Sequence, residues 1–461
     1  MRCRGLGFGV MGLLTAAAFL AVPSTVWSQD SSGTTSSTSS MAGIAIDADG
    51  VLRTRTFSDP TGQVMRERIG AARASLDPKI VSYSKLRKVS LNRLEQAIHD
   101  HQNVLNEEMR YLAGLQRIRY VFYYPDSKDI VLAGPAEGWT ADLSGRVVGL
   151  TSGRPVVQLQ DVVVALRMFP ADGSRGPMIG CSIDPTPEGL AAMQQFLRSN
   201  QPNPNEPKPF VEGLRNSLGY QLVRIDGVPA KTRFAQVMVE ADYRMKLIGI
   251  GLEQPPVRLT SYVDRARPGE VARNAMQRWF FLPDYRCVRE SEDKLGMELV
   301  GDGVKLVGED EVVGANGQRR RSISRSNKAS QAFVVNFTKR YPELAERSPV
   351  YAELRNLIDV SIAAAYIQEQ RFCEKAGWKM ELFGDEKEFP VETYSIPKTV
   401  ETAANAIWKG QSLMTPVGGG VQIQANEALK SERLLSDDKG RVSTLRETIK
   451  PNLAKGQWWW D

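Results

Sequence analysis

The sequence offers many carboxylates but few of the other side chains that enzymes use. It contains 53 Asp and Glu residues and only two histidines, His99 and His101. The scarcity of histidine excludes most metal sites built on several imidazoles and most Ser-His-Asp arrangements. Any catalysis would therefore depend mainly on carboxylates, Lys, Tyr or Cys. The carboxylates to consider first are Glu240 and Asp242, then Asp284 and Glu290.

Two carboxyl groups can cleave a glycosidic bond when they lie roughly 5–9.5 Å apart across a cleft. Such a hydrolase would act on polysaccharide or peptide, with the pKa of one acid raised by its surroundings. Ion pairing is the alternative, because Glu240 and Arg244, like Asp242 and Lys246, are four residues apart, the spacing of solvated pairs on a helix. We favour ion pairing, since a chain with this many acids will contain suggestive pairs by chance.

No complete metal or cofactor motif occurs in the sequence. Gly418, Gly419 and Gly420 resemble a phosphate-binding loop, but the Gly-Lys-Ser/Thr that would hold phosphate and magnesium does not follow them. His99 and His101 are two residues apart, so on a helix they would point to different faces and could not chelate one ion. The sequence therefore predicts no metal site and no cofactor.

A basic run at residues 314–330 is a candidate binding surface. It contains no acid and these basic residues: Arg319, Arg320, Arg321, Arg325 and Lys328. Clustered guanidinium groups bind phosphate- or carboxylate-bearing polymers bidentately. Nucleic acid is not expected, because the run lacks the interleaved aromatic residues of single-strand binders. The alternative, a solvated surface loop without a partner, is favoured by its Gly, Asn and Ser content.

Three consecutive tryptophans, Trp458, Trp459 and Trp460, follow a polar and charged tail. Exposed, they would form an apolar patch that stacks on sugars or docks to a partner protein. Packed, they would only fix the tail to the folded body, which is the interpretation we favour.

The start of the chain has the pattern of a secretory signal peptide. Arg2 and Arg4 give a positive start, an apolar run at residues 13–22 follows, and small residues precede a cut near Ser28. An uncleaved anchor is the alternative, but the run is shorter than the roughly 20 residues that span a bilayer. We expect an exported protein, periplasmic or extracellular after cleavage, with no transmembrane helix in the mature chain.

Three cysteines follow the expected cleavage point, so at most one internal disulfide can form. Cys287 and Cys373 are the candidate pair. The alternative, which we favour, is that these two and Cys181 are buried small apolar residues.

A long helix is predicted in the first half of the chain from a seven-residue repeat. Its seam residues follow one another at alternating steps of three and four: Leu91, Leu94, Ile98, His101, Leu105, Glu108, Leu112 and Leu115. The seam could form a homodimer or dock onto another protein, with its two polar residues fixing the register. We favour an amphipathic helix packed on the protein's own sheet, because Ala97 and Val104 widen its apolar face.

The pattern of helices and strands predicts an α+β fold with two mixed α/β domains and mainly antiparallel strands. A strand is expected at residues 257–262, a hairpin folded at Gly301-Asp302-Gly303, and a helix between two layers at about residues 232–248. The predicted organisation is a signal peptide (1–28), a Ser/Thr-rich linker (29–42), an N-terminal domain (43–199), a Pro-rich linker (200–209), a C-terminal domain (210–429) and a polar tail (430–461).

Three stretches carry a family resemblance: RIRYVFYYPD at residues 117–126, DIVLAGPAEGW at 129–139 and MIGCSIDPTPEG at 178–189. Together they resemble a domain of unknown function, number 1598, found in exported planctomycete proteins. The resemblance covers roughly residues 119–198, and residues 241–246 look like the usual companion of that domain. It implies export and lineage, and it implies no activity and no catalytic residue.

These observations predict a non-enzymatic binding or scaffold component of the cell envelope. Its partner would be an envelope protein of unknown identity or an anionic polymer, and a homodimer is possible. The charge balance says little about the partner, since 59 basic residues against 53 acidic ones make only a weak field. The alternative is an extracytoplasmic carboxylate-dependent hydrolase, which requires a cleft where two acids converge.

Overall fold

Helices and mainly antiparallel strands make up the protein, which is the predicted α+β class. The computed structural model describes residues 40–170, 173–174, 176, 178–201, 203, 205–267, 275–313, 318–321, 327–408 and 412–461. The expected signal peptide and most of the Ser/Thr-rich linker lie outside these residues. The described residues, from Ser40 to Asp461, belong to one compact unit.

The larger sheet has ten strands, antiparallel except where β2 meets β15 and β10 meets β17. Its order is β1 (Ser40–Ile46), β2 (Val51–Ser58), β15 (Thr399–Val400), β9 (Gln221–Asp226), β8 (Ile179–Asp184), β17 (Ser412–Ile423), β10 (Ala275–Pro283), β13 (Val304–Val313) and β14 (Arg319–Arg321), with β16 (Ala404–Trp408) also on β17. Strands from both sides of residues 200–209 pair here. This sheet therefore joins the two expected halves. The division into two domains stays a prediction.

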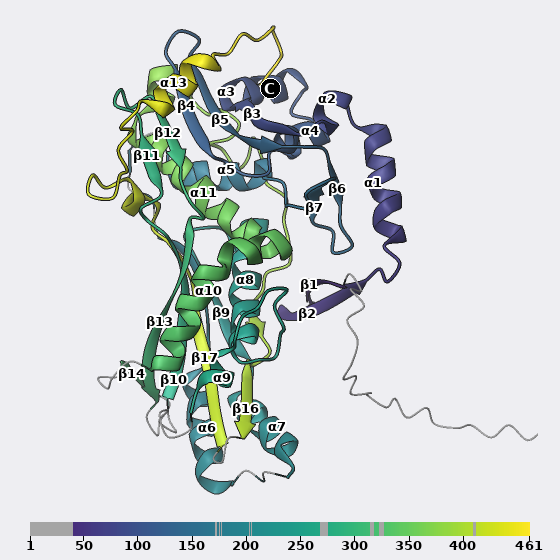
Figure 1. Cartoon of the computed structure of the whole chain (residues 1–461), viewed down its shortest axis with the longest axis vertical. Helices are drawn as coiled ribbons and strands as arrows, with labels where there is room; N and C mark the ends of the chain where they lie inside the picture. Colours follow the sequence, from purple (N-terminus) through teal and green to yellow (C-terminus); the bar gives the residue numbers. More distant parts are fainter. Residues whose placement is uncertain are drawn as a thin grey trace, which may run out of the picture. The chain divides into compact units, whose positions relative to one another are not determined.

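The second sheet has six strands and is antiparallel throughout. Its order is β11 (Val288–Glu290), β12 (Gly296–Leu299), β4 (Tyr120–Tyr124), β5 (Asp129–Ala136), β3 (Ser84–Ser90) and β18 (Trp459–Trp460). A separate pair, β6 (Trp139–Ala141) and β7 (Val147–Gly149), forms a short hairpin. The larger sheet and this one appear at opposite ends of Figure 1.

The helices cover both sheets. They are α1 (Gln63–Ser75), α2 (Pro78–Val81), α3 (Leu91–Asp100), α4 (Glu107–Arg110), α5 (Leu159–Met168), α6 (Pro187–Ser199), α7 (Pro207–Leu218), α8 (Arg233–Gly249), α9 (Tyr262–Arg265), α10 (Lys328–Arg347), α11 (Pro349–Glu369), α12 (Phe372–Ala376) and α13 (Arg441–Thr448), with 3₁₀ turns η1 (Leu112–Gly114) and η3 (Ala425–Leu429). Helix α8 contacts β8 and β17 on one side and α11 on another, which confirms the predicted helix between two layers.

The long helix predicted from the seven-residue repeat is not continuous. Helix α3 ends at Asp100, and Gln102 and Asn103 then adopt left-handed backbone angles, φ +59° and +63°. A new helix starts only at α4, where the Asn106 side chain accepts a hydrogen bond from the Met109 amide at 2.8 Å. The left-handed backbone at Gln102 and Asn103 ends α3, and the Asn106 cap starts α4, although the apolar spacing continues through both.

Two other local predictions were wrong. No strand forms at residues 257–262; instead Ser261 caps α9 by accepting from the Asp264 amide at 3.1 Å. Gly301 and Gly303 have positive φ as a tight turn requires, but β12 and β13 on either side of them belong to different sheets. The turn chemistry was recognised, but the pairing partners were set by the tertiary structure.

Candidate functional site

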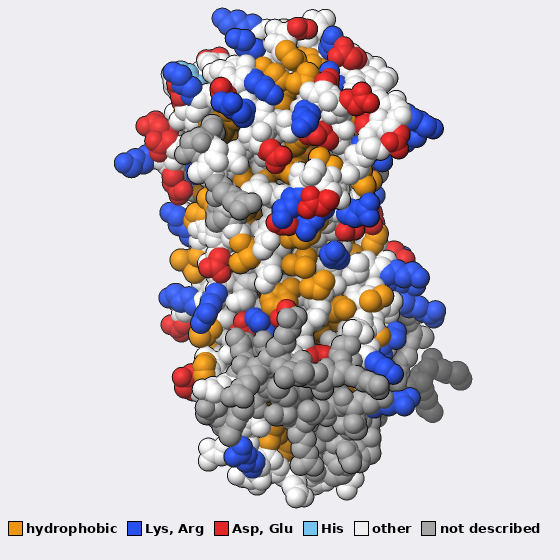
Figure 2. Space-filling model, turned by 90° about the vertical axis from the view of Figure 1, so that its left-hand side faces the viewer, with side chains coloured by type: hydrophobic (Ala, Val, Ile, Leu, Met, Phe, Trp, Pro, Cys, Tyr) orange, Lys and Arg blue, Asp and Glu red, His pale blue; other side chains and the backbone are white. Residues whose placement is uncertain are grey.

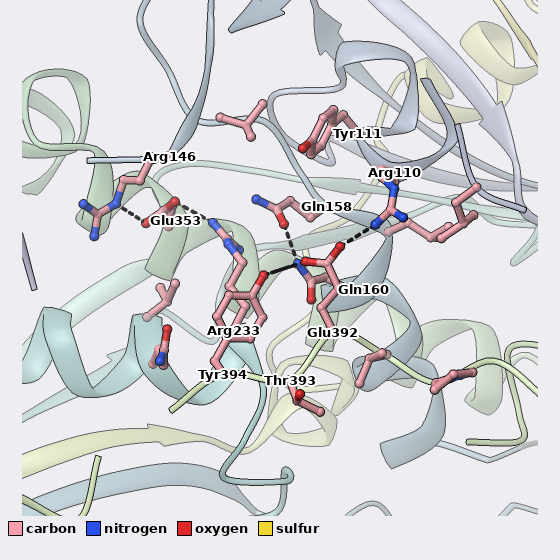
Figure 3. A pocket seen from close by; sticks show the side chains of 18 of the residues that line it. Arg110, Tyr111, Arg146, Gln158, Gln160, Arg233, Glu353, Glu392, Thr393 and Tyr394 are labelled. Carbon is pink, nitrogen blue, oxygen red and sulfur yellow. Dashed lines mark hydrogen bonds and ion pairs between the residues drawn. The ribbon is translucent and has the colours of Figure 1, made fainter. Parts of the chain in front are cut away.

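A cavity of about 930 Å³ lies where several elements meet. Its lining comes from the β6–β7 turn, the first turns of α5 and α8, helices α4 and α11, and the segment at residues 388–394. Figure 3 shows polar side chains from these elements around it. At this volume it falls near the upper end of the range for small-molecule sites, about 300–1,000 Å³.

Local structure brings two arginines to the cavity. Asp142 closes the β6–β7 turn, because its Oδ1 accepts from the Ser144 amide at 2.8 Å and from the Arg146 amide at 2.9 Å. This fixes the point from which the Arg146 side chain extends. Thr232 caps the start of α8 by accepting from the Ala235 amide at 3.3 Å, so Arg233 projects from its first turn.

Four of the lining residues form what we call the cavity floor: Arg146, Arg233, Glu240 and Glu353. Arg146 is paired with Glu240, and its Nε donates to Glu353 Oε2 at 2.9 Å. Arg233 is paired with the other oxygen of Glu353. Figure 3 shows Glu353 between the two guanidinium groups. The floor is therefore a row of alternating charges, two positive and two negative.

The alternation continues beyond the floor at both ends. Arg233 also pairs with Asp161 of α5, and Glu240 lies 3.4 Å from Nη1 of Arg244, one turn along α8. Arg244 in turn holds Glu253 at 2.7 Å. Asp161 and Glu253, the terminal acids of this chain of charges, do not line the cavity. We call this row of paired residues the charge chain; among the described residues it contains four acids (Asp161, Glu353, Glu240 and Glu253) and three arginines (Arg233, Arg146 and Arg244).

Burial and ion pairing shift the pKa values of these acids in different directions. Burial raises the pKa of Asp161 to about 6, although Arg233 opposes it. Burial also raises the pKa of Glu240, against the effect of Arg146 and Arg244. For Glu353, burial acts in the same upward direction, but its two guanidinium partners outweigh it and lower the pKa.

A second group of lining residues forms what we call the polar wall: Arg110, Gln160, Glu392 and Tyr394. Arg110 pairs with Glu392, whose other oxygen accepts from the Tyr394 hydroxyl at 2.9 Å. Gln160 Nε2 donates to the same hydroxyl at 3.0 Å. These contacts, seen in Figure 3, connect the segment at residues 388–394 to α4 and α5.

Of the predicted carboxylates, only Glu240 lines the cavity. Asp242 lies on the sheet side of α8 and is paired with Lys246. The prediction that the pairs on α8 are solvated was wrong, because Glu240, Asp242, Arg244 and Lys246 are each at most 5% exposed. Asp284 and Glu290 are absent from the lining.

Sequence reasoning missed Arg146, Arg233 and Glu353. Arg146 and Glu353 are in contact although 207 residues separate them in the sequence. No short motif connects the three residues. The helix at residues 232–248 was predicted to lie between two layers, but its charged pairs were predicted to be solvated, so no sequence signal indicated a buried network of charges.

Most of the basic run lies outside the described residues. Arg319–Arg321 form β14, which pairs with β13, but nothing is described of their side chains. Arg325 lies among the residues that are not described, and Lys328 begins α10. The anion-binding prediction for this run is not tested. Figure 2 shows basic and acidic side chains interspersed over the described part of one face.

The predicted seam is divided between the core and the surface. Leu91, Leu94, Ile98, Leu112 and Leu115 are fully buried in the main hydrophobic core. His101 is exposed, and Leu105 and Glu108 are half-buried. The buried leucines thus pack within the chain, as the favoured alternative expects.

The terminal tryptophans pack against the body of the protein. Trp458 is buried, and Trp459 and Trp460 form β18 on β3. The Arg87 guanidinium lies 4.7 Å from the Trp459 ring centre and 2.8 Å from Asp461 Oδ2. Trp459 Nε1 also donates to Glu108. These contacts connect the tail to the second sheet.

The three described cysteines, Cys181, Cys287 and Cys373, are buried free thiols, so Cys287 and Cys373 do not form the candidate disulfide in this structure. Burial raises the pKa of Cys287 to about 12 and that of Cys373 to about 11. In the described ranges there is no group of three or more His, Cys, Asp or Glu that could hold a metal ion. No helix among the same residues is long and apolar enough to cross a membrane.

Residues 181–262 match the family described as "Protein of unknown function (DUF1598)". The matched segment runs from β8 to the start of α9 and contains Arg233 and Glu240 of the cavity floor. It overlaps the segment expected from the resemblance over residues 181–198 and includes residues 241–246. No curated protein and no solved structure matches the chain.

Proposed function

We propose that this chain is an exported, non-enzymatic binding protein of the cell envelope, and that its ligand binds in the cavity. The export part of the proposal depends on the signal-peptide pattern of residues 1–28. The binding part depends on the volume of the cavity and on its lining of planar polar and aromatic side chains.

The observation that carries the proposal is that both acids of the cavity floor are held by arginines. Arg146 contacts Glu240 and Glu353 together, and Arg233 holds the second oxygen of Glu353. A general acid must hold a proton that it can donate, and guanidinium contacts favour the ionised carboxylate instead. A nucleophile needs an oxygen directed at the substrate, and both oxygens of Glu353 are held by arginines. The floor is thus arranged to present fixed hydrogen-bonding groups, which suits binding better than catalysis.

A hydrolase is the second candidate, and one specific observation favours it. The pKa of Glu240 is raised and that of Glu353 is lowered within one cavity. Carboxylates whose pKa values are pushed apart are the usual acid and base of glycoside hydrolysis. The test must therefore separate binding from turnover.

Four probes of different charge serve as test ligands: tetra-N-acetylchitotetraose (neutral), chitotetraose (cationic), tetragalacturonate (anionic) and tetra-alanine (zwitterionic). We expect at least one probe to raise the melting temperature of the full chain and to be recovered intact by mass spectrometry after long incubation. Thr393→Trp places a bulky ring on an exposed lining residue and should abolish the effect, whereas Thr61→Trp, at an exposed threonine outside the lining, should not.

If wild type yields shortened probes by mass spectrometry and Glu240→Gln does not, the function is hydrolysis and the non-enzymatic proposal is wrong. Failure of all four probes to bind would refute the ligand-binding proposal. The export proposal has a separate test, which is N-terminal sequencing of the protein recovered from a periplasmic extract. A sequence that begins at Gln29 is expected, and one that begins at Met1 would contradict cleavage.

The basic run remains a second proposed contact. Its arginines and lysine, Arg319, Arg320, Arg321, Arg325 and Lys328, would hold an anionic envelope polymer through bidentate hydrogen bonds.

A further inference from the structure

We infer that the cavity takes a neutral, polyhydroxylated ligand of the saccharide class. This inference rests on the proposed function, since it names the chemistry of the ligand that the cavity would bind. Three properties of the lining support it: the balance of its charges, the mixture of donors and acceptors, and the aromatic surfaces between them.

Charge balance argues against a charged ligand. The floor holds two arginines and two glutamates in mutual pairs, with side chains only 3–12% exposed. On the polar wall, Arg110 is paired with Glu392. At the floor, a ligand carboxylate or phosphate would have to take a guanidinium from a buried acid, which would leave that acid without compensation. Breaking a buried pair in this way is strongly unfavourable, because it leaves an uncompensated buried charge. Arg110 and Glu392 are 40% and 54% exposed, so water and salt screen their charges.

The surplus acid of the charge chain does not face the ligand. Asp161 and Glu253 terminate the chain outside the cavity lining. Glu388 does line the cavity, but it is exposed, so water and salt screen its charge. A cationic ligand therefore gains little electrostatic attraction from the lining, and a neutral ligand binds without breaking an ion pair.

The hydrogen-bonding groups suit hydroxyls. A hydroxyl group donates one hydrogen bond and accepts up to two, so it needs donors and acceptors side by side. Gln160 Nε2 donates to Gln158 Oε1 at 2.6 Å and to the Tyr394 hydroxyl at 3.0 Å, which uses both of its hydrogens. Gln160 therefore offers its Oε1 as an acceptor, and Gln158 offers its Nε2 as a donor. The Tyr394 hydroxyl likewise donates to Glu392 and accepts from Gln160.

Aromatic rings complete the lining. Tyr111, Phe389 and Tyr394 all line the cavity, and Tyr111 is held edge-on against Trp139 with ring centres 5.5 Å apart. Such rings offer an apolar face with a polar edge, which matches the C–H faces and hydroxyl rim of a sugar ring. A peptide with free termini is disfavoured, because it would bring two unpaired charges into a lining whose arginines are each already paired with a glutamate.

Calorimetric titration of the full chain with the four probes defined above tests the inference. We expect tetra-N-acetylchitotetraose to bind at least tenfold more tightly than chitotetraose, tetragalacturonate and tetra-alanine. Gln160→Leu removes the amide at nearly constant volume and should weaken that binding at least tenfold. Gln63→Leu, on the exposed face of α1, is the matched control and should leave it unchanged.

Each remaining outcome has a defined meaning. A charged or zwitterionic probe that binds more tightly, and that loses affinity in Gln160→Leu and Thr393→Trp, would overturn the neutral-ligand inference and keep the binding function. If a probe binds to Gln160→Leu and Thr393→Trp with the same affinity as to wild type, both the inference and the proposed site are wrong. Circular dichroism spectra that match wild type would show that the variants are folded.

Discussion

Lys246 carries a charge that the structure buries completely, and its removal should be costly. Its ammonium donates to Asp242 Oδ2 at 2.7 Å and to the carbonyl oxygens of Ile183 and Gly419 at 3.0 and 3.2 Å. Lys246→Met keeps most of the side-chain length but leaves Asp242 without a cation. Removal of one partner of a buried pair costs about 3–5 kcal/mol of unfolding free energy. Solvated pairs, which the i,i+4 spacing alone had indicated, contribute only about 0–1 kcal/mol.

The loss should depend on pH with a defined sign. Burial raises the pKa of Asp242 to about 6 even with Lys246 beside it, so removal of Lys246 should raise that pKa further. An acid whose pKa is higher in the folded state binds a proton on folding, and stability falls as pH rises through that pKa. Lys246→Met should therefore be most destabilising near pH 7 and less so near pH 5.

Urea unfolding followed by circular dichroism measures both effects. Lys246→Met/Asp242→Leu removes the unpaired charge and should recover most of the lost stability. Lys450→Met disrupts the exposed pair with Glu447 and should leave the unfolding free energy nearly unchanged. A loss below about 1 kcal/mol in Lys246→Met at pH 7, or one that stays the same at pH 5, would refute a buried, charged pair.

Two further predictions concern the seam and the charge chain. Ile98→Asp should prevent folding, because Ile98 is fully buried, whereas Leu105→Asp at a half-buried position should leave a folded protein by size-exclusion chromatography and circular dichroism. A folded monomer from Ile98→Asp, compared with a wild-type dimer, would instead support the dimer seam. Burial raises the pKa of Asp161 to about 6, so wild type should lose stability relative to Asp161→Asn as pH rises from about 4 to about 7 in urea unfolding. An equal difference at both pH values would contradict the raised pKa.

Local sequence signals are informative where a cap defines the end of an element. Thr186 and Pro187 are residue types that start helices, and in the structure Thr186 Oγ1 accepts from the Gly189 amide at 2.9 Å at the start of α6. The two apolar stripes of α8 correctly indicated a helix between two layers. The same method failed for the long seam helix, because the apolar spacing continued through a segment whose backbone leaves the helix at Gln102 and Asn103.

Solvent exposure was the property that periodicity described least well. The spacing of Asp242 and Lys246 identified the pair, but it gave no information on what covers that side of α8. In the structure strands β8 and β17 cover it, and their carbonyl groups at Ile183 and Gly419 complete the coordination of the ammonium. Whether a pair on a helix is solvated depends on the neighbouring layer, which is distant in the sequence.

The sequence alone determined the fold class, many local elements and the scarcity of imidazole chemistry, because these depend on composition and on neighbours a few residues apart. The tertiary structure decided the cavity. Arg146, Arg233 and Glu353 lie on a turn and two helices that are far apart in the chain, and they meet only when those elements pack. Electrostatic interactions between buried groups depend on distance in space and on the exclusion of water, and neither is encoded at short range in the sequence.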